Sequence, residues 1–126
     1  MGNDKDLSSG DGVKLLVDSF YEKVNQDDLL SPIFNEFADV NWESHLPRMY
    51  EFWDTILFYK GSYKGSPFPK HVPLPIEKMH FDRWISLFNS TVDEHFKGEM
   101  ADEAKLRALS IATVFQSKIS QLGKLT

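Results

Sequence analysis

The chain has 126 residues, of which 41% are hydrophobic and 26% charged, as is typical of one globular domain. Its formal net charge is −5 without a run of Lys and Arg, which argues against a nucleic-acid partner, since phosphate recognition needs a basic surface. The absence of cysteine excludes disulfides, thiolate catalysis and cysteine-held metal sites. Ten Phe, four Tyr and three Trp predict a core built mainly of rings, or one that encloses a flat apolar group.

Targeting and membrane segments are not expected. Residues 1–12 are polar and lack the apolar stretch of a signal peptide, and the sequence holds no run of about 18 apolar residues that would cross a bilayer. We therefore expect a cytoplasmic protein with no membrane span. Residues 1–10 are expected to form a flexible tail, and residues 11–126 a single domain.

The first half of the domain shows helical periodicity. Apolar residues spaced by three and four predict a helix over about 11–24. The Ser-Pro pair at 31–32 favours the start of a short helical turn, since a capping hydroxyl followed by proline suits that position. A longer helix is predicted over about 41–59. Pro47 would break its interior, so we expect regular hydrogen bonding to begin close to Ser44.

The second half begins with a segment that cannot stay helical. Residues 60–75 contain two glycines and four prolines, and so long an irregular stretch inside a compact domain is usually functional. Helices are predicted over about 76–96 and 101–122, the second ended by Gly123. Strand alternation is absent from the sequence. The predicted fold class is all-α, with four main helices and a short one.

His71 has the most suggestive surroundings of the four histidines. It lies in the irregular segment between Pro69 and Pro73, which stiffen the backbone and fix the direction of the imidazole. Such rigidity suits a metal ligand. From position alone, however, a surface histidine in a loop is the more frequent case.

Three further polar groups lie on apolar helix faces. They are the imidazole of His45, the hydroxyl of Tyr21 and the indole N–H of Trp84. A buried Tyr or Trp needs a partner for its polar end. Each residue alone is an ordinary core residue, but together they are compatible with one shared pocket. The single Glu-x-x-His motif at 77–80 does not predict a di-iron site, which needs two copies.

Six groups of residues, spread from about Val13 to Leu122, match one known family in order and spacing. They are Phe20–Val24, Ser31–Asn35, Trp42–His45, Phe52–Trp53, Lys70–His71 with Leu74–Pro75, and Trp84 with Leu87–Phe88. On these residues the chain resembles the truncated haemoglobins, specifically the third of their three groups. The lack of a Gly-Gly pair agrees with this group, since the other two carry glycine-pair motifs. The resemblance implies the truncated globin fold, a 2-over-2 helical sandwich around haem b.

The resemblance also implies roles for single residues. His71 would be the proximal ligand of the haem iron, for which a neutral imidazole is the globin choice. Tyr21, His45 and Trp84 would line the distal side, where a diatomic gas binds.

The flat apolar ring of haem also needs apolar walls, and its propionates need cations nearby. The wall candidates, whose alternative role is core packing, are Phe20, Met49, Phe52, Trp53, Val72, Phe88 and Phe34. The propionate candidates are Arg48 and Lys70, although exposed Arg and Lys are common in any protein.

Several functions agree with these residues. Oxygen on ferrous haem carries partial negative charge, so a hydrogen bond from Tyr21 or Trp84 would stabilise it by about 1–3 kcal/mol. Tight holding favours redox chemistry on O2, NO or CO, such as the conversion of nitric oxide to nitrate or the reduction of a peroxide. Such turnover would require an external reductase. The alternatives are oxygen storage, sensing or scavenging without turnover, and a haem-free helical interaction module. A monomer is expected.

Overall fold

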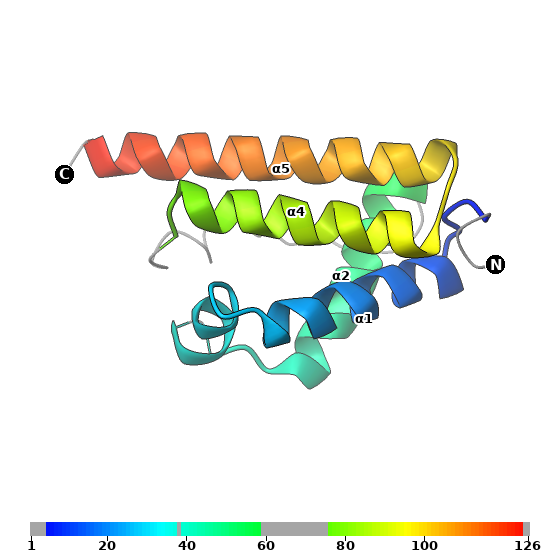
Figure 1. Cartoon of the computed structure of the whole chain (residues 1–126), viewed down its shortest axis with the longest axis horizontal. Helices are drawn as coiled ribbons and strands as arrows, with labels where there is room; N and C mark the ends of the chain where they lie inside the picture. Colours follow the sequence, from blue (N-terminus) through cyan, green and yellow to red (C-terminus); the bar gives the residue numbers. More distant parts are fainter. Residues whose placement is uncertain (1–4, 38, 59–75, 125–126) are drawn as a thin grey trace.

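The computed structural model describes residues 5–37, 39–58 and 76–124. Every regular element in these ranges is helical: α1 (Asp11–Gln26), the π-helical turn η2 (Ile33–Phe37), α2 (Trp42–Phe58), α4 (Lys78–His95) and α5 (Glu99–Lys124). Antiparallel α4 and α5 lie side by side, and α1 and α2 cross beneath them (Figure 1). The all-α prediction, with two helices over two, is confirmed. None of the described helices is long and apolar enough to cross a bilayer.

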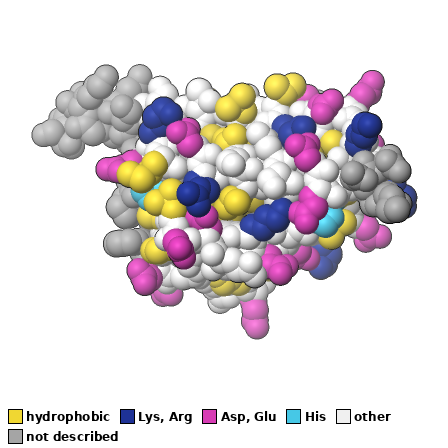
Figure 2. Space-filling model, in the orientation of Figure 1, with side chains coloured by type: hydrophobic (Ala, Val, Ile, Leu, Met, Phe, Trp, Pro, Cys, Tyr) yellow, Lys and Arg dark blue, Asp and Glu magenta, His cyan; other side chains and the backbone are white. Residues whose placement is uncertain are grey.

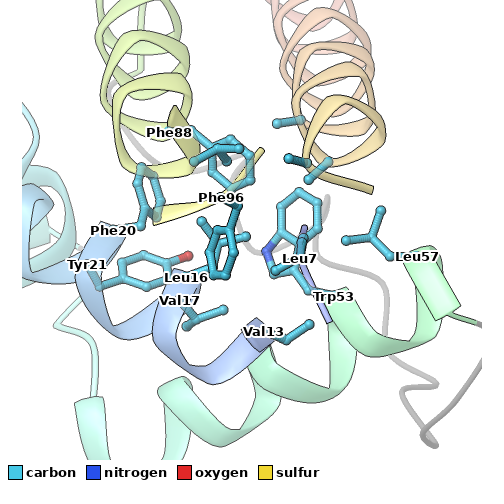
Figure 3. Packing of buried hydrophobic residues seen from close by; sticks show 14 of the residues in the cluster. Leu7, Val13, Leu16, Val17, Phe20, Tyr21, Trp53, Leu57, Phe88 and Phe96 are labelled. Atoms are coloured by element: carbon cyan, nitrogen blue, oxygen red, sulfur yellow. The ribbon is translucent and has the colours of Figure 1, made fainter. Parts of the chain in front are cut away.

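The core forms where α1, α2 and α4 meet (Figure 3). α1 supplies most of it, through side chains spaced by three and four along one face, as the periodicity predicted. Each of these is at most 2% exposed: Val13, Leu16, Val17, Phe20 and Val24. Trp53 from α2 stacks on Phe88 from α4, with ring centroids 5.0 Å apart and an interplanar angle of 25°. The aromatic surplus of the sequence is thus used at least partly for packing.

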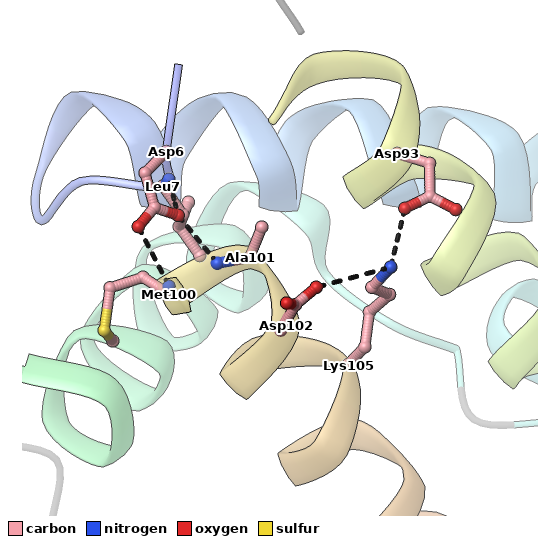
Figure 4. A network of polar contacts seen from close by, with 7 residues as sticks. All are labelled: Asp6, Leu7, Asp93, Met100, Ala101, Asp102 and Lys105. Atoms are coloured by element: carbon pink, nitrogen blue, oxygen red, sulfur yellow. Dashed lines mark hydrogen bonds and ion pairs between the residues drawn. The ribbon is translucent and has the colours of Figure 1, made fainter. Parts of the chain in front are cut away.

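α5 joins the core through a row of alanines. Ala101, Ala104, Ala108 and Ala112 are at most 5% exposed, and α5 packs mainly on α4. Small side chains on the buried face allow the two helices to approach closely. An ion pair also joins the two helices at the surface: Nζ of Lys105 on α5 lies 2.7 Å from a carboxylate oxygen of Asp93 on α4 (Figure 4).

Residues 5–10 pack against the helices, although we expected a flexible tail over residues 1–10. Leu7 is 3% exposed and belongs to the core. The carboxylate of Asp6 accepts the backbone N–H groups of Met100 and Ala101, at 2.9 and 2.8 Å, and so caps the first turn of α5 (Figure 4). One buried leucine and one helix cap therefore fix this segment.

The cap has consequences for charge and for backbone shape. Burial alone would raise the pKa of Asp6, but hydrogen bonds from the backbone N–H groups of Met100, Ala101 and Leu7 outweigh it, so the pKa is lowered. Gly98, just before α5, has a φ of +147°, which favours glycine. A Cβ there would also lie 2.5 Å from Cγ of Asp6. Gly98 thus leaves room for the carboxylate.

One predicted helix boundary is wrong, and Pro47 does not interrupt its helix. α2 begins at Trp42, close to the predicted start, and its hydrogen bonding begins where expected, since the backbone N–H groups of Ser44 and His45 donate to Asn41 at 3.2 and 2.9 Å. Pro47 lies in the second turn, and the helix continues past it because later turns are anchored in the core. α5 runs through the expected stop at residue 123 and ends at residue 124.

Candidate functional site

Tyr21 lies at the centre of a group of rings between α1, η2 and α2. Its side chain is 7% exposed. Its ring centroid lies 5.3 Å from that of Trp42, 5.4 Å from that of His45 and 5.8 Å from that of Phe34. Tyr21 and His45, two of the three predicted distal residues, are therefore in contact although 24 positions separate them in the chain.

The surroundings of Tyr21 keep its hydroxyl in the form that donates a hydrogen bond. Burial raises the pKa of Tyr21 above its ordinary value, because the apolar surroundings disfavour the phenolate. The hydroxyl is consequently protonated at neutral pH. A neutral, buried phenol can donate to a small ligand that carries negative charge.

Trp42 is part of this group, which the sequence analysis did not predict. Its ring lies 5.5 Å from that of His45, and its Nε1–H donates to Oδ1 of Asn35 at 2.9 Å. The amide of Asn35 in turn donates to Oδ1 of Asn25 at 2.8 Å. The three-residue spacing to His45 was a signal for Trp42, since it places both on one helix face. No comparable pattern in the sequence predicted the hydrogen bonds that involve Asn35 and Asn25.

Trp84, the third predicted distal residue, belongs to a neighbouring ring group. It is half-buried on α4, with its ring 5.5 Å from Phe20 and nearly perpendicular to it, and it stacks on Phe88 at 5.6 Å. Phe20 also contacts Tyr21, at 4.9 Å. The described rings thus connect Trp84 to Tyr21 through Phe20, and the three distal candidates form a series along the α1–α2–α4 junction rather than one cluster.

The wall candidates divide into two kinds. Phe20, Trp53 and Phe88 are at most 4% exposed and are packed by other rings of the core. Met49 and Phe52 on α2, like Trp84, are only half-buried, although they are apolar and pack against the core. A flat apolar group needs such incompletely covered surface, so these residues fit it.

The remaining candidates are one exposed residue and three residues that the structure does not describe. Arg48 is exposed on α2. His71, Lys70 and Val72 lie outside the described residues. Within the described part of the chain no three His, Asp or Glu side chains are placed to hold a metal ion together. The Glu-x-x-His motif has a structural use, since Nδ1 of His80 accepts the backbone N–H of Glu77 at 2.9 Å at the start of α4.

A groove between α1 and α2 reaches Tyr21 from the surface. Its other lining residues include Trp42 and Leu46 from α2. At one end, Asp18 accepts a hydrogen bond from the hydroxyl of Tyr50 and lies 2.7 Å from Nζ of Lys14. These polar contacts join α1 to α2 next to the ring group of Tyr21.

Comparison with known proteins agrees with the helical fold. The model of the bacterial-like globin family matches residues 7–117. A group 3 truncated haemoglobin, ctb, from Campylobacter jejuni is 33% identical over 117 residues, which cover 90% of this chain and 92% of the relative. The crystal structure of the group III truncated haemoglobin from Campylobacter jejuni superposes with a TM-score of 0.78 at 33% identity, covering 85% of this chain and 87% of that one.

The family match extends over most of the domain, including α1, α2, α4 and the greater part of α5. Membership of a globin family implies a haem cofactor and a diatomic ligand. By sequence and by fold, this chain belongs to the bacterial-like globins and, within them, to the group III truncated haemoglobins.

Proposed function

We propose that the chain binds haem b through His71 and binds O2, NO or CO on the side where Tyr21, His45 and Trp84 lie. The observation that carries the distal half of this proposal is the contact of Tyr21 with His45, with ring centroids 5.4 Å apart and the tyrosine buried. It supports a small polar site in otherwise apolar surroundings. Haem would supply an iron that binds a diatomic gas.

The chain's own residues would hold the ring and orient the gas. The proposed walls are the half-buried Met49 and Phe52, with Phe20, Trp53 and Phe88 behind them and Val72 near the proximal ligand. The propionates would be bound by Arg48 and Lys70. Tyr21 would donate its hydroxyl proton in a hydrogen bond to the ligand, because burial keeps that proton in place.

Strong donors in a buried site slow the release of a gas, so we infer chemistry rather than transport. The proposed reaction is the oxidation of nitric oxide to nitrate or the reduction of a peroxide in the cytoplasm. Repeated turnover would require electrons, which we propose come from an external reductase.

The first test is the absorbance spectrum of the purified protein with and without added hemin. A Soret band that is lost in His71→Ala and kept in His95→Ala supports the proximal ligand, because His95 is a half-buried histidine near the far end of α4. A chain without a Soret band even after hemin is added would overturn haem binding. A His71→Ala variant that binds hemin as tightly as wild type would overturn the proximal assignment alone.

The second test addresses turnover. The protein is reduced, exposed to air and mixed with nitric oxide, and nitrate is measured. Stoichiometric nitrate, followed by renewed consumption when a cell extract and a nicotinamide donor are added, is expected. Slow autoxidation without consumption of nitric oxide would instead favour storage or sensing.

A further inference from the structure

Trp42 contacts every other ring of the group around Tyr21. Its ring centroid lies 5.3 Å from that of Tyr21, 5.5 Å from that of His45 and 5.9 Å from that of Phe34. The rings of Trp42 and Tyr21 both meet that of His45 nearly edge-on, at 83° and 79°. Edge-to-face contacts have a preferred geometry, so they fix the orientation of a ring as well as its position.

The indole of Trp42 is anchored by a chain of amide hydrogen bonds. Its Nε1–H donates to Oδ1 of Asn35 at 2.9 Å. Nδ2 of Asn35 donates in turn to Oδ1 of Asn25 at 2.8 Å and to the backbone oxygen of Ser31 at 3.1 Å. A side-chain amide can make all three bonds because it carries both an acceptor and two donors. This amide chain joins the first residue of α2 to the last turn of α1.

Each end of the amide chain lies one helical turn from a polar residue of the proposed distal site. Asn25 follows Tyr21 by four residues on α1, so the two lie on one face of that helix. Trp42 precedes His45 by three residues on α2, with the same consequence. The amide chain therefore sets the spacing of α1 and α2 at the point where Tyr21 and His45 meet.

On the basis of the proposed function, we propose that Trp42 is a positioning residue: it holds the hydroxyl of Tyr21 in the orientation that donates to the gas, and Asn35 holds the indole in place. Trp42 acts through Tyr21 and does not itself contact the gas. Without the indole, a space opens on the α2 side of the phenol, because a closely packed interior closes only partly around a lost side chain. The phenol then samples further orientations, and its hydrogen bond to the gas is made for only part of the time.

Trp42→Leu in the haem-loaded protein tests this role, because leucine keeps an apolar side chain but removes the ring. The oxygen dissociation rate should rise about threefold or more, up to the rate of Tyr21→Phe. In a Tyr21→Phe background the same change should add less than about twofold, because no hydroxyl is left to position. Tyr50→Leu is the matched control: it also removes a half-buried ring on α2 and a hydrogen bond to α1, at Asp18, and should leave the rate unchanged.

The infrared spectrum of bound carbon monoxide reports the hydrogen bond itself. A donor near the oxygen lowers the C–O stretching frequency, so wild type should show one main band, and Trp42→Leu a second band at the higher frequency of Tyr21→Phe. Asn35→Ala, a change at an exposed residue, should give the same second band more weakly, because the ring stays but its anchor is lost. Acidic and basic side chains are interspersed on the face in Figure 2, and none of these variants alters a charge, so the field of the surface charges stays the same.

The outcomes distinguish a failure of this role from a failure of the proposed function. If Tyr21→Phe leaves the rate and the band unaltered, the hydroxyl does not bind the gas, and the positioning role is overturned with it. If Tyr21→Phe raises the rate, a wild-type band in Trp42→Leu overturns the positioning role alone, as does an equal effect of Trp42→Leu with and without the hydroxyl. Equal rates in Trp42→Leu and Tyr50→Leu would show a general loosening of the α1–α2 contact and also overturn it. A wild-type band in Asn35→Ala would overturn the anchoring of the indole, even where Trp42→Leu fails to fold.

Discussion

Tyr21→Phe tests the proposed distal site most directly. The change removes one oxygen and keeps a ring that contacts Phe34, Trp42 and His45 at 5.3–5.8 Å. Because the packing is retained, the free energy of unfolding should change by less than about 1.5 kcal/mol. The lost hydrogen bond to the gas is worth about 1–3 kcal/mol, so the oxygen dissociation rate should rise about 5–150-fold.

Stopped-flow displacement of oxygen by carbon monoxide measures that rate. Tyr50→Phe is the matched control, since its hydroxyl donates to Asp18 in the α1–α2 groove, and it should leave the rate unchanged. Burial raises the pKa of Tyr21, so in wild type the slow rate should persist beyond pH 10, where an ordinary tyrosine loses its proton. An unaltered rate in Tyr21→Phe, with an intact Soret band, would refute the role of the hydroxyl.

Three further predictions concern stability, each measured by urea denaturation. Asp6→Ala should lower the free energy of unfolding by about 1 kcal/mol at pH 7. Because the pKa of Asp6 is lower in the folded state, this contribution is present above about pH 4 and fades as the pH falls. A difference between Asp6→Ala and wild type that persists at pH 2 would contradict the cap. Gly98→Ala should cost at least about 1 kcal/mol, since φ is +147° and the added Cβ meets Asp6; an unchanged midpoint would show that the capping turn is not required. Ala108→Leu should lower the free energy of unfolding by about 1–3 kcal/mol, because the larger side chain overpacks the α4–α5 contact. The control Ser90→Leu, at an exposed position on α4, should change it by less than about 0.5 kcal/mol. Equal effects of the two variants would refute close packing at Ala108.

The helices were predictable where their apolar faces were long and regular. α1 begins where the periodicity places it and ends two residues later than expected, because a repeat from Val13 to Val24 marks a buried face but not the last turn. Boundaries that depend on single residues were less predictable. Pro47 was expected to break a helix interior, yet it lies in the second turn of α2, where burial of later residues such as Trp53 keeps the helix continuous.

The N-terminal segment could not be predicted from local sequence. Its polar composition is typical of a tail, and the structure contradicts this for residues 5–10 because Asp6 finds its partners more than 90 positions away, at the start of α5. Such a contact has no local periodicity or motif. Leu7, a lone apolar residue among polar ones, was the available signal.

The candidate site was predictable in its residues more than in its arrangement. The spacing on apolar faces and the family resemblance identified Tyr21, His45 and Trp84, and the first two lie against each other. The position of Trp84 beyond Phe20 depends on how α4 crosses α1, which the sequence does not encode locally. The roles of these residues toward a gas, and that of His71 toward iron, stay predictions.

The docking of Asp6 onto the start of α5 also limits how the chain can be rearranged. α5 has 26 residues, so its end at Lys124 lies about 39 Å from the turn that Asp6 caps. A circular permutant that joins residue 124 back to residue 5 would need a linker of at least about 11 residues in extended form. A shorter linker should break the hydrogen bonds of Asp6 to α5 or unfold the last turns of α5. The fold is therefore better suited to fusion of another domain at one end of the chain than to circular permutation with a short linker.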